Sequence, residues 1–170
     1  MIPGMTASSS TQPEIADIIR ATPFAAELTE AQCTELAKIS TLRHLDDGET
    51  LIHEGRIDNS VHVLTHGHLA VIKEAEGGKE EHLHTLKPGE IAGAMGFIDG
   101  MEHTATLRSL GEAEILSIER EKLESLLQTH PVLVYRVMRG IMRSVHAIVR
   151  RMNNQYVQMT NYITKQRGRY

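Results

Sequence analysis

The sequence is poor in the residues that form disulfides and large aromatic cores. It contains a single cysteine, Cys33, no tryptophan and two phenylalanines among 170 residues. One cysteine excludes an internal disulfide and is typical of a reducing compartment, so we expect a cytoplasmic protein. The hydrophobic core must be built mainly from aliphatic side chains.

Long apolar runs are absent as well. No stretch reaches the roughly 18 apolar residues that a membrane-spanning helix needs, so we expect no membrane association. The N-terminus, MIPGMTASSSTQP, lacks the basic segment followed by an apolar segment that marks a secretion signal. We expect residues 1–12 to be a disordered lead rich in Ser, Thr and Pro.

Acidic residues are missing from the last part of the chain. The net charge is −4, yet no Asp or Glu follows Glu124, whereas the same stretch contains eight basic residues: Arg136, Arg139, Arg143, Arg150, Arg151, Lys165, Arg167 and Arg169. Such a division of charge is typical of an interaction surface. Two interpretations stay open: the basic segment contacts a partner, or it docks on the acidic part of its own or a neighbouring chain.

Two helices are expected before a long β-rich region. Apolar positions predict a helix from Pro13 to Ala21, and Thr29 followed by Gln32 has the form of a capping box that begins a second helix. Residues 42–118 then contain short alternating runs separated by regularly spaced turn residues. We therefore predict an α+β fold, in which about eight strands form an antiparallel β-roll or jelly-roll barrel over residues 13–129.

Helical spacing returns near the C-terminus. A short helix follows Glu119, and Pro131 suits the first position of a long helix, which we place at residues 130–160, before a basic tail at 161–170. Its apolar positions are spaced 4, 3, 4, 3 and 4: Val134, Met138, Ile141, Val145, Ile148 and Met152. This seam predicts a coiled-coil homodimer. The alternative is that the same face packs on the barrel. Gly140 lies in the middle of this helix, where glycine is unfavourable, and indicates a bend or a close contact.

One glycine-rich stretch, GEIAGAMGFIDGMEHTATL at residues 89–107, stands out within the β-rich region. Glycines at this density let backbone amides approach a ligand closely, and phosphate is a common ligand of that kind. The stretch contains no lysine or arginine, and His103 is its one potential cation. It is therefore a candidate phosphate site without a fixed positive charge.

The order of elements and three motifs resemble the cyclic-nucleotide-binding domain family, which includes catabolite-activator-like regulators and kinase regulatory subunits. The motifs are LDDGETLIHEG, SVHVLTHGHLAV and LKPGEIAGAMGFIDGMEHTATL, the last of which is similar to the phosphate-binding cassette of that family. The resemblance covers residues 13–155. It implies a regulatory binding module with the barrel and the long dimerising helix described above.

The resemblance also implies a candidate site. The residues that align with the ligand-binding part of the cassette are Gly93, Ala94, Met95, Gly96, His103, Thr104 and Ala105. In the family a glutamate binds the ribose hydroxyl and an arginine binds the phosphate; these two positions hold Ala94 and His103 here. Since the long helix lies over the pocket in the family, Arg139, Arg143 and Ser144 are expected to contact the ligand.

These residues predict a stand-alone dimeric regulator with weak or altered nucleotide binding, acting through a protein partner. A cyclic mono- or dinucleotide is the expected ligand class; a ligand-free scaffold and a conventional cyclic AMP sensor are the alternatives. After the seam, the remaining residues are too few for a helix-turn-helix unit, so we expect no DNA binding. We find no nucleophile–base motif and no supported metal signature, and we expect neither an enzyme nor a required cofactor.

Overall fold

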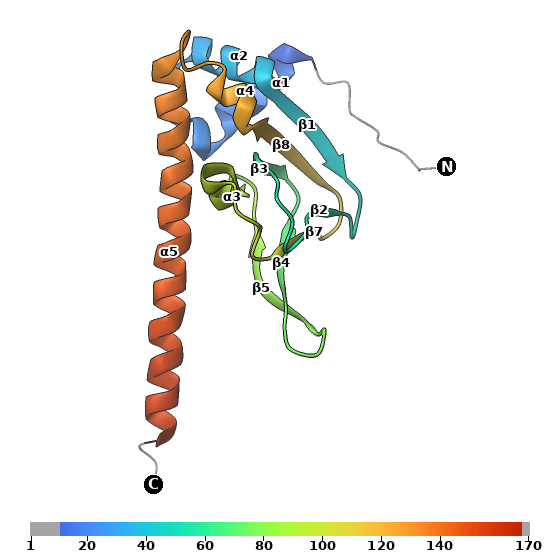
Figure 1. The fold of residues 1–170 in the computed structure, drawn as a ribbon, viewed down its shortest axis with the longest axis vertical. Helices are drawn as coiled ribbons and strands as arrows, with labels where there is room; N and C mark the ends of the chain where they lie inside the picture. Colours follow the sequence, from blue (N-terminus) through green and yellow to red (C-terminus); the bar gives the residue numbers. More distant parts are fainter. Residues whose placement is uncertain (1–10, 168–170) are drawn as a thin grey trace, which may run out of the picture.

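The computed structural model describes residues 11–167, with side chains placed up to Thr164. The chain begins with three short helical segments and ends with a single long helix, and the strands lie between them (Figure 1). The helices are α1 Gln12–Ala21, the 3-10 helix η1 Pro23–Ala25, α2 Glu30–Ile39, α3 Ala94–Asp99, α4 Arg120–Glu124 and α5 Pro131–Arg167. This arrangement confirms the predicted α+β class.

Eight antiparallel strands form two four-stranded sheets. The strands are β1 Ser40–Leu45, β2 Thr50–Ile52, β3 Ser60–His66, β4 Leu69–Glu74, β5 Glu80–Leu86, β6 Ile91–Ala92, β7 Thr106–Ser109 and β8 Ala113–Glu119. One sheet has the order β1-β8-β3-β6 and the other β2-β7-β4-β5. Because β6 belongs to the first sheet and β7 to the second, the cassette that connects them passes from one sheet to the other.

Local signals in the sequence set the helix ends. The capping box that begins α2 is present: the Gln32 amide donates to Thr29 Oγ1 at 3.3 Å, and the Thr29 amide donates to Gln32 Oε1 at 3.1 Å. Pro131 is the first residue of α5, as expected. The predicted lead ends earlier than expected, since Thr11 caps α1 and Gln12 begins it. The predicted tail begins later, because α5 continues through Arg167, and residues 1–10 and 168–170 lie outside the described part of the chain.

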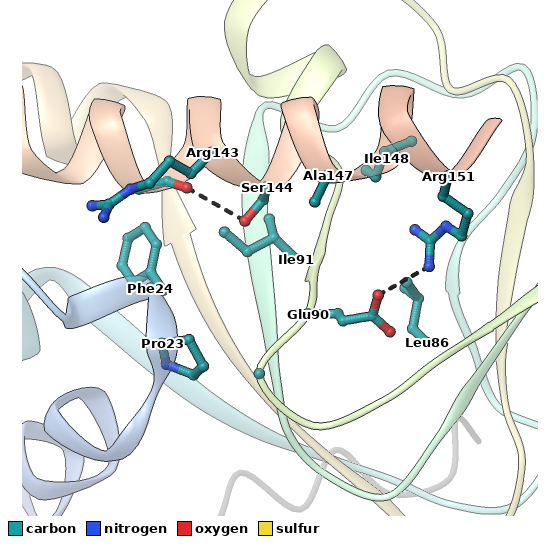
Figure 2. Close-up of a pocket in the computed structure, with 12 residues that line it drawn as sticks. Pro23, Phe24, Leu86, Glu90, Ile91, Arg143, Ser144, Ala147, Ile148 and Arg151 are labelled. Atoms are coloured by element: carbon teal, nitrogen blue, oxygen red, sulfur yellow. Dashed lines mark hydrogen bonds and ion pairs between the residues drawn. The ribbon is translucent and has the colours of Figure 1, made fainter. Parts of the chain in front are cut away.

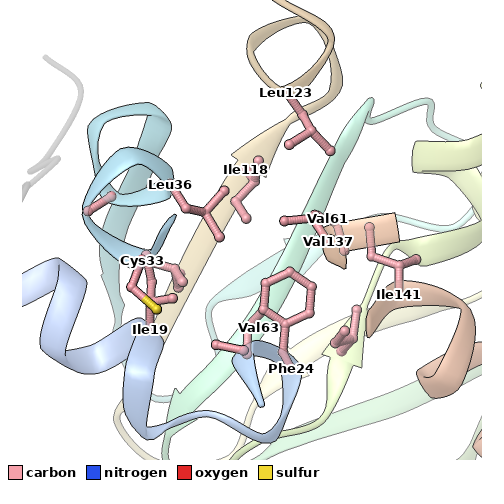
Figure 3. Close-up of a cluster of buried hydrophobic side chains, with 14 of the residues drawn as sticks. Ile19, Phe24, Cys33, Leu36, Val61, Val63, Ile118, Leu123, Val137 and Ile141 are labelled. Carbon is pink, nitrogen blue, oxygen red and sulfur yellow. The ribbon is translucent and has the colours of Figure 1, made fainter. Parts of the chain in front are cut away.

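Two hydrophobic clusters hold the domain together. One fills the space between the two sheets and contains Leu45, Leu64 and Ile115. The other joins the helices to the outer face of the first sheet: Phe24 lies beside Val63 of β3, and Leu36 beside Ile118 of β8 (Figure 3). As expected from the composition, both clusters are mainly aliphatic.

The N-terminal half of α5 belongs to this second cluster. Val134, Val137 and Ile141 are buried in the core of their own domain. Val134 and Ile141 are therefore not available to a partner, which corrects the predicted dimer seam at these two positions. Met138 and Val145 are partly buried against the same cluster, and Ile148 is partly buried as well, whereas Met152 is 61% exposed.

Candidate functional site

The cassette begins with a tight turn between β6 and α3. Gly93 has a left-handed backbone with φ of 76°, and a Cβ atom built on it would lie 2.8 Å from the Ser60 carbonyl oxygen. Glycine is the residue that accepts both the conformation and the close contact. The short helix α3 ends at Gly100, and the chain then returns to β7 past His103 and Thr104.

Backbone hydrogen bonds attach this returning segment to the loop between β2 and β3. The Gly55 amide donates to the His103 carbonyl at 2.8 Å, and the His103 amide donates to the Arg56 carbonyl at 2.9 Å. The Glu54 amide donates to Thr106 Oγ1 at 3.1 Å. The segment is thus held in place by residues about 50 positions earlier in the chain.

A chain of polar side chains lies on β3 and β8 beneath the cassette. His62 is 5% exposed; its Nε2 is 2.8 Å from Asp58 Oδ2 and its Nδ1 is 2.8 Å from Ser117 Oγ. Burial raises the pKa of Asp58, but the hydrogen bond and charge of His62 outweigh it and hold that pKa below its ordinary value. Asp58 is therefore an anion in the interior of the site, paired with His62.

His103 lies next to this chain and packs against α3. A Cβ atom on Gly96 would lie 3.0 Å from His103 Cε1, so the glycine makes room for the ring. The His103 Nε2 atom is buried and has no hydrogen-bond partner among the described residues. Burial lowers the pKa of His103, although the nearby Asp58 acts in the opposite direction. The ring is consequently neutral at pH 7 and supplies no fixed charge.

A lysine from β4 contacts the returning segment of the cassette. Lys73 Nζ donates to the Thr104 carbonyl oxygen at 2.9 Å and pairs with the Glu54 carboxylate. The other Glu54 oxygen accepts from the Glu74 amide at 3.1 Å. The hydrogen bond from Lys73 lowers the pKa of Glu54. Sequence reasoning did not include Lys73 or Glu54 in the site.

The predicted cassette residues occupy different surroundings. Gly93, Gly96 and His103 lie around the interior of the cassette, as just described, and Thr104 is exposed at its edge while Ala105 is partly buried. Ala94 is 5% exposed and belongs to the helix-side hydrophobic cluster. Met95 is 60% exposed.

The three residues of α5 that were expected to contact the ligand lie elsewhere. Arg139 and Arg143 both pair with Glu27, at 3.3 and 2.9 Å. Arg143 and Ser144 line a cavity of about 290 Å³ between α5, η1 and the turn before β6 (Figure 2). Its lining includes the start of the cassette motif, at Leu86 and residues 89–91, but none of the predicted ligand-binding residues at 93–96 and 103–105. At the far end of this cavity, Arg151 pairs with Glu90 at 3.1 Å. Contacts from these helix residues to a ligand stay a prediction.

The described residues were also compared with the requirements for a membrane-spanning helix and for a metal site. None of their helices combines the length and apolar character needed to cross a bilayer. Among them, no three His, Cys, Asp or Glu side chains are grouped in the way that would hold a metal ion. His82 and His84, which alternate on β5, bind instead to Thr85 and Arg151, respectively.

Comparisons with known proteins agree with this geometry. The family model for the cyclic nucleotide-binding domain matches residues 42–130, which include the barrel and the cassette. The cAMP-activated global transcriptional regulator CRP of Salmonella typhimurium is 29% identical over 106 residues, covering 62% of this chain and 50% of the relative. The chain thus spans about half the length of the curated relatives of this kind.

Solved structures show the same fold. A cyclic nucleotide-binding domain from Methylobacillus flagellatus superimposes with a TM-score of 0.77 at 20% identity, over 87% of this chain and 83% of the other. The N-terminal domain of a transcriptional regulator from Streptomyces coelicolor has a TM-score of 0.67 at 27% identity, over 80% and 95%. Since the family model covers more than half of the residues, the chain belongs to the cyclic nucleotide-binding domain family.

Proposed function

We propose that this chain is the ligand-binding part of a dimeric regulator whose cassette takes a cyclic nucleotide weakly or in an altered manner. The observation that carries the proposal is His103. Backbone hydrogen bonds hold the cassette around it. A neutral ring stands where the related family has arginine, and its buried Nε2 has no partner in the part of the chain that the structure describes. Ala94 likewise stands at the glutamate position, and its methyl group is buried.

The missing groups weaken the usual ligand interactions. A hydrogen bond to a charged group contributes roughly 1.5–3 kcal/mol, and a bidentate arginine on phosphate contributes at least as much. Without both, binding loses roughly 3–6 kcal/mol, which corresponds to about two to four decades of affinity. A conventional response to micromolar cyclic AMP is therefore not what this pocket favours.

The helix contacts bear on the choice between a cyclic mononucleotide and a cyclic dinucleotide. A cyclic dinucleotide would need a second cationic site, and Arg139 and Arg143 are the α5 cations that were expected to contact the ligand. Both are engaged by Glu27, outside the cassette. The geometry thus favours a ligand with one phosphate. The ligand-free scaffold stays as the second candidate, because the cassette is held in place by its own hydrogen bonds.

Output through protein contacts would use the exposed side of α5. Met142, Val149, Met152 and Tyr156 are each at least 47% exposed, although they are apolar or aromatic. An exposed stripe of this kind on a long helix favours association with a second helix. We propose a second copy of this chain as that partner, so that the regulator is a homodimer.

The ligand proposal is tested by titrating the wild-type chain, His103→Arg and His103→Gln with cyclic AMP and cyclic GMP. We expect wild-type binding in the millimolar range at pH 7.5 and about tenfold or greater tightening by His103→Arg, since a permanent charge-assisted bond is restored. Wild-type affinity should rise as the pH falls from 7.5 to 5, because the ring, whose pKa burial lowers, gains its proton toward the acidic end of this range. The His103→Gln variant should show no such rise. His53→Arg, at an exposed position on the neighbouring loop, is the matched control.

Three outcomes would contradict the proposal in different ways. Micromolar binding by the wild type would indicate a conventional cyclic AMP sensor. An affinity that does not change between pH 7.5 and 5 would remove His103 from the site. If neither the wild type nor His103→Arg binds any nucleotide, the scaffold interpretation replaces the proposed one.

A further inference from the structure

Lys73 reaches the cassette because of its place in β4. Side chains alternate between the two faces of a strand, and Leu69, Val71 and Lys73 share one face. Leu69 is buried in the cluster between the sheets, and Val71 packs against the same cluster. Lys73 therefore projects from the inner side of the barrel, at the end where the cassette returns toward β7.

The contacts of the ammonium group place it at the edge of the candidate phosphate site. Nζ donates to the carbonyl of Thr104, the residue directly after His103, at 2.9 Å. Its second partner is the carboxylate of Glu54. An ammonium group has three hydrogens to donate, and these two partners use two of them. The third is available to a ligand in the cassette.

We propose that Lys73 is the residue that sets the anion affinity of the cassette, and that Glu54 is its internal competitor. The inference rests on the proposed function, in which the cassette takes a phosphate-bearing ligand. Glu54 holds the lysine in the resting site and adds a negative charge that opposes an incoming anion. A ligand phosphate takes the place of part of the Glu54 interaction when it binds.

The chemistry of lysine also defines the ligand class. Its ammonium is a compact point charge without the planar fork by which arginine matches a phosphate in two places. Ala94 offers no carboxylate to a ribose hydroxyl. A site that recognises its ligand mainly through the charge of the phosphate accepts nucleoside monophosphates with either a cyclic or a linear phosphate. Adenosine, which has no phosphate, should gain nothing from Lys73.

Two arginines also lie near the cassette. Arg120 contacts the cassette helix, where its Nη1 donates to the Phe97 carbonyl at 3.4 Å, and Arg56 lies on the β2–β3 loop. Its carbonyl accepts from the His103 amide, but its side chain belongs to an exposed residue of the β2–β3 loop. No hydrogen bond or ion pair holds the Arg56 side chain among the described residues, whereas Lys73 is held by two partners. The geometry favours Lys73, and Arg56→Met serves as the matched control.

The test compares calorimetric titrations of the wild type, Glu54→Gln, Glu54→Gln/Lys73→Met and Arg56→Met with cyclic AMP, 5′-AMP and adenosine. Glutamine at position 54 keeps an oxygen that accepts from the Glu74 amide, so the loop should stay in place. We expect Glu54→Gln to bind both nucleotides about tenfold or more tightly than the wild type, because Lys73 is released. Adding Lys73→Met should remove that gain, and Arg56→Met should change little.

A further variant keeps the test independent of folding. Glu54→Gln/Lys73→Arg retains a cation at position 73 and should retain most of the gain. If Glu54→Gln and Glu54→Gln/Lys73→Met bind the nucleotides alike, including the case in which neither binds, the inference is overturned. Loss of binding in Arg56→Met would overturn it too. The proposed function fails separately, when neither the wild type nor His103→Arg binds a nucleotide.

Discussion

A histidine at position 103 makes the charge of the cassette depend on pH, whereas an arginine would be charged throughout the physiological range. The ring is flanked by Asp58, His62 and Asp99, so groups of both signs act on it. Burial has the largest effect and lowers the pKa of His103. The resting cassette is therefore built around a neutral imidazole.

The neutral His103 ring should make the free energy of unfolding depend on pH. An unfolded histidine titrates near pH 6.5, but the folded ring takes up its proton at lower pH. The contribution of the neutral ring is fully present above about pH 6.5 and is lost as the pH falls toward the lowered pKa. We expect the free energy of unfolding, measured by urea denaturation, to fall more steeply between pH 7.5 and 5.5 in the wild type than in His103→Gln. Equal slopes would assign the effect to other groups such as His84, whose pKa burial also lowers.

The position of Lys73 could be predicted from the sequence only in part. The alternation Leu69, Val71, Lys73 could have placed the lysine on the inner face of a strand. Its partners could not have been identified, because Thr104 and Glu54 are 31 and 19 residues away in sequence. Closure of the barrel brings them together, and no local pattern encodes that closure. The glycines of the cassette could be recognised because they lie within one short stretch, residues 89–107.

At the level of single elements, α5 shows how one periodic pattern supports two interpretations. Apolar residues occur on more than one side of this helix, and a shift of one residue changes which stripe is chosen as the seam. The sequence-based seam included Val134 and Ile141, but the domain core buries them. Gly140 lies on this inward side, which explains a residue that is unfavourable in helices. A Cβ atom there would lie 2.8 Å from the Phe24 carbonyl oxygen and 3.0 Å from its ring.

Gly140→Ala should therefore destabilise the protein, contrary to the usual effect of alanine in a helix. Intrinsic propensity favours alanine over glycine by about 1 kcal/mol. Overpacking against a backbone carbonyl in a close-packed contact costs typically 1–3 kcal/mol, and α5 would have to move away from η1. We expect a net loss of about 1 kcal/mol in the free energy of unfolding by chemical denaturation. A gain in stability would show that the α5–η1 contact is loose.

At the scale of the whole molecule, α5 extends well beyond the body of the domain (Figure 1). Residues 152–164 are all exposed, and they contain no charged side chain. An exposed stripe recurs every seven residues along the helix: Tyr135, Met142, Val149, Tyr156 and Ile163. Three residues after the first four of these positions come Met138, Val145, Met152 and Met159. This is the pattern of a two-stranded seam, displaced by one residue from the sequence-based prediction at its buried positions.

The displaced seam predicts which substitutions separate the proposed dimer. Val149→Asp with Tyr156→Asp places charges at the centre of the exposed stripe, and we expect the mass measured by light scattering to fall to that of one chain. Helical content should fall as well, because an isolated helix end without tertiary contacts is marginally stable in water. Asn154→Asp is the control: it adds a charge to the same helix outside the stripe and should leave the mass unchanged. A monomeric mass for the wild type, or an unchanged mass for the double variant, would show that the stripe does not join two copies of this chain.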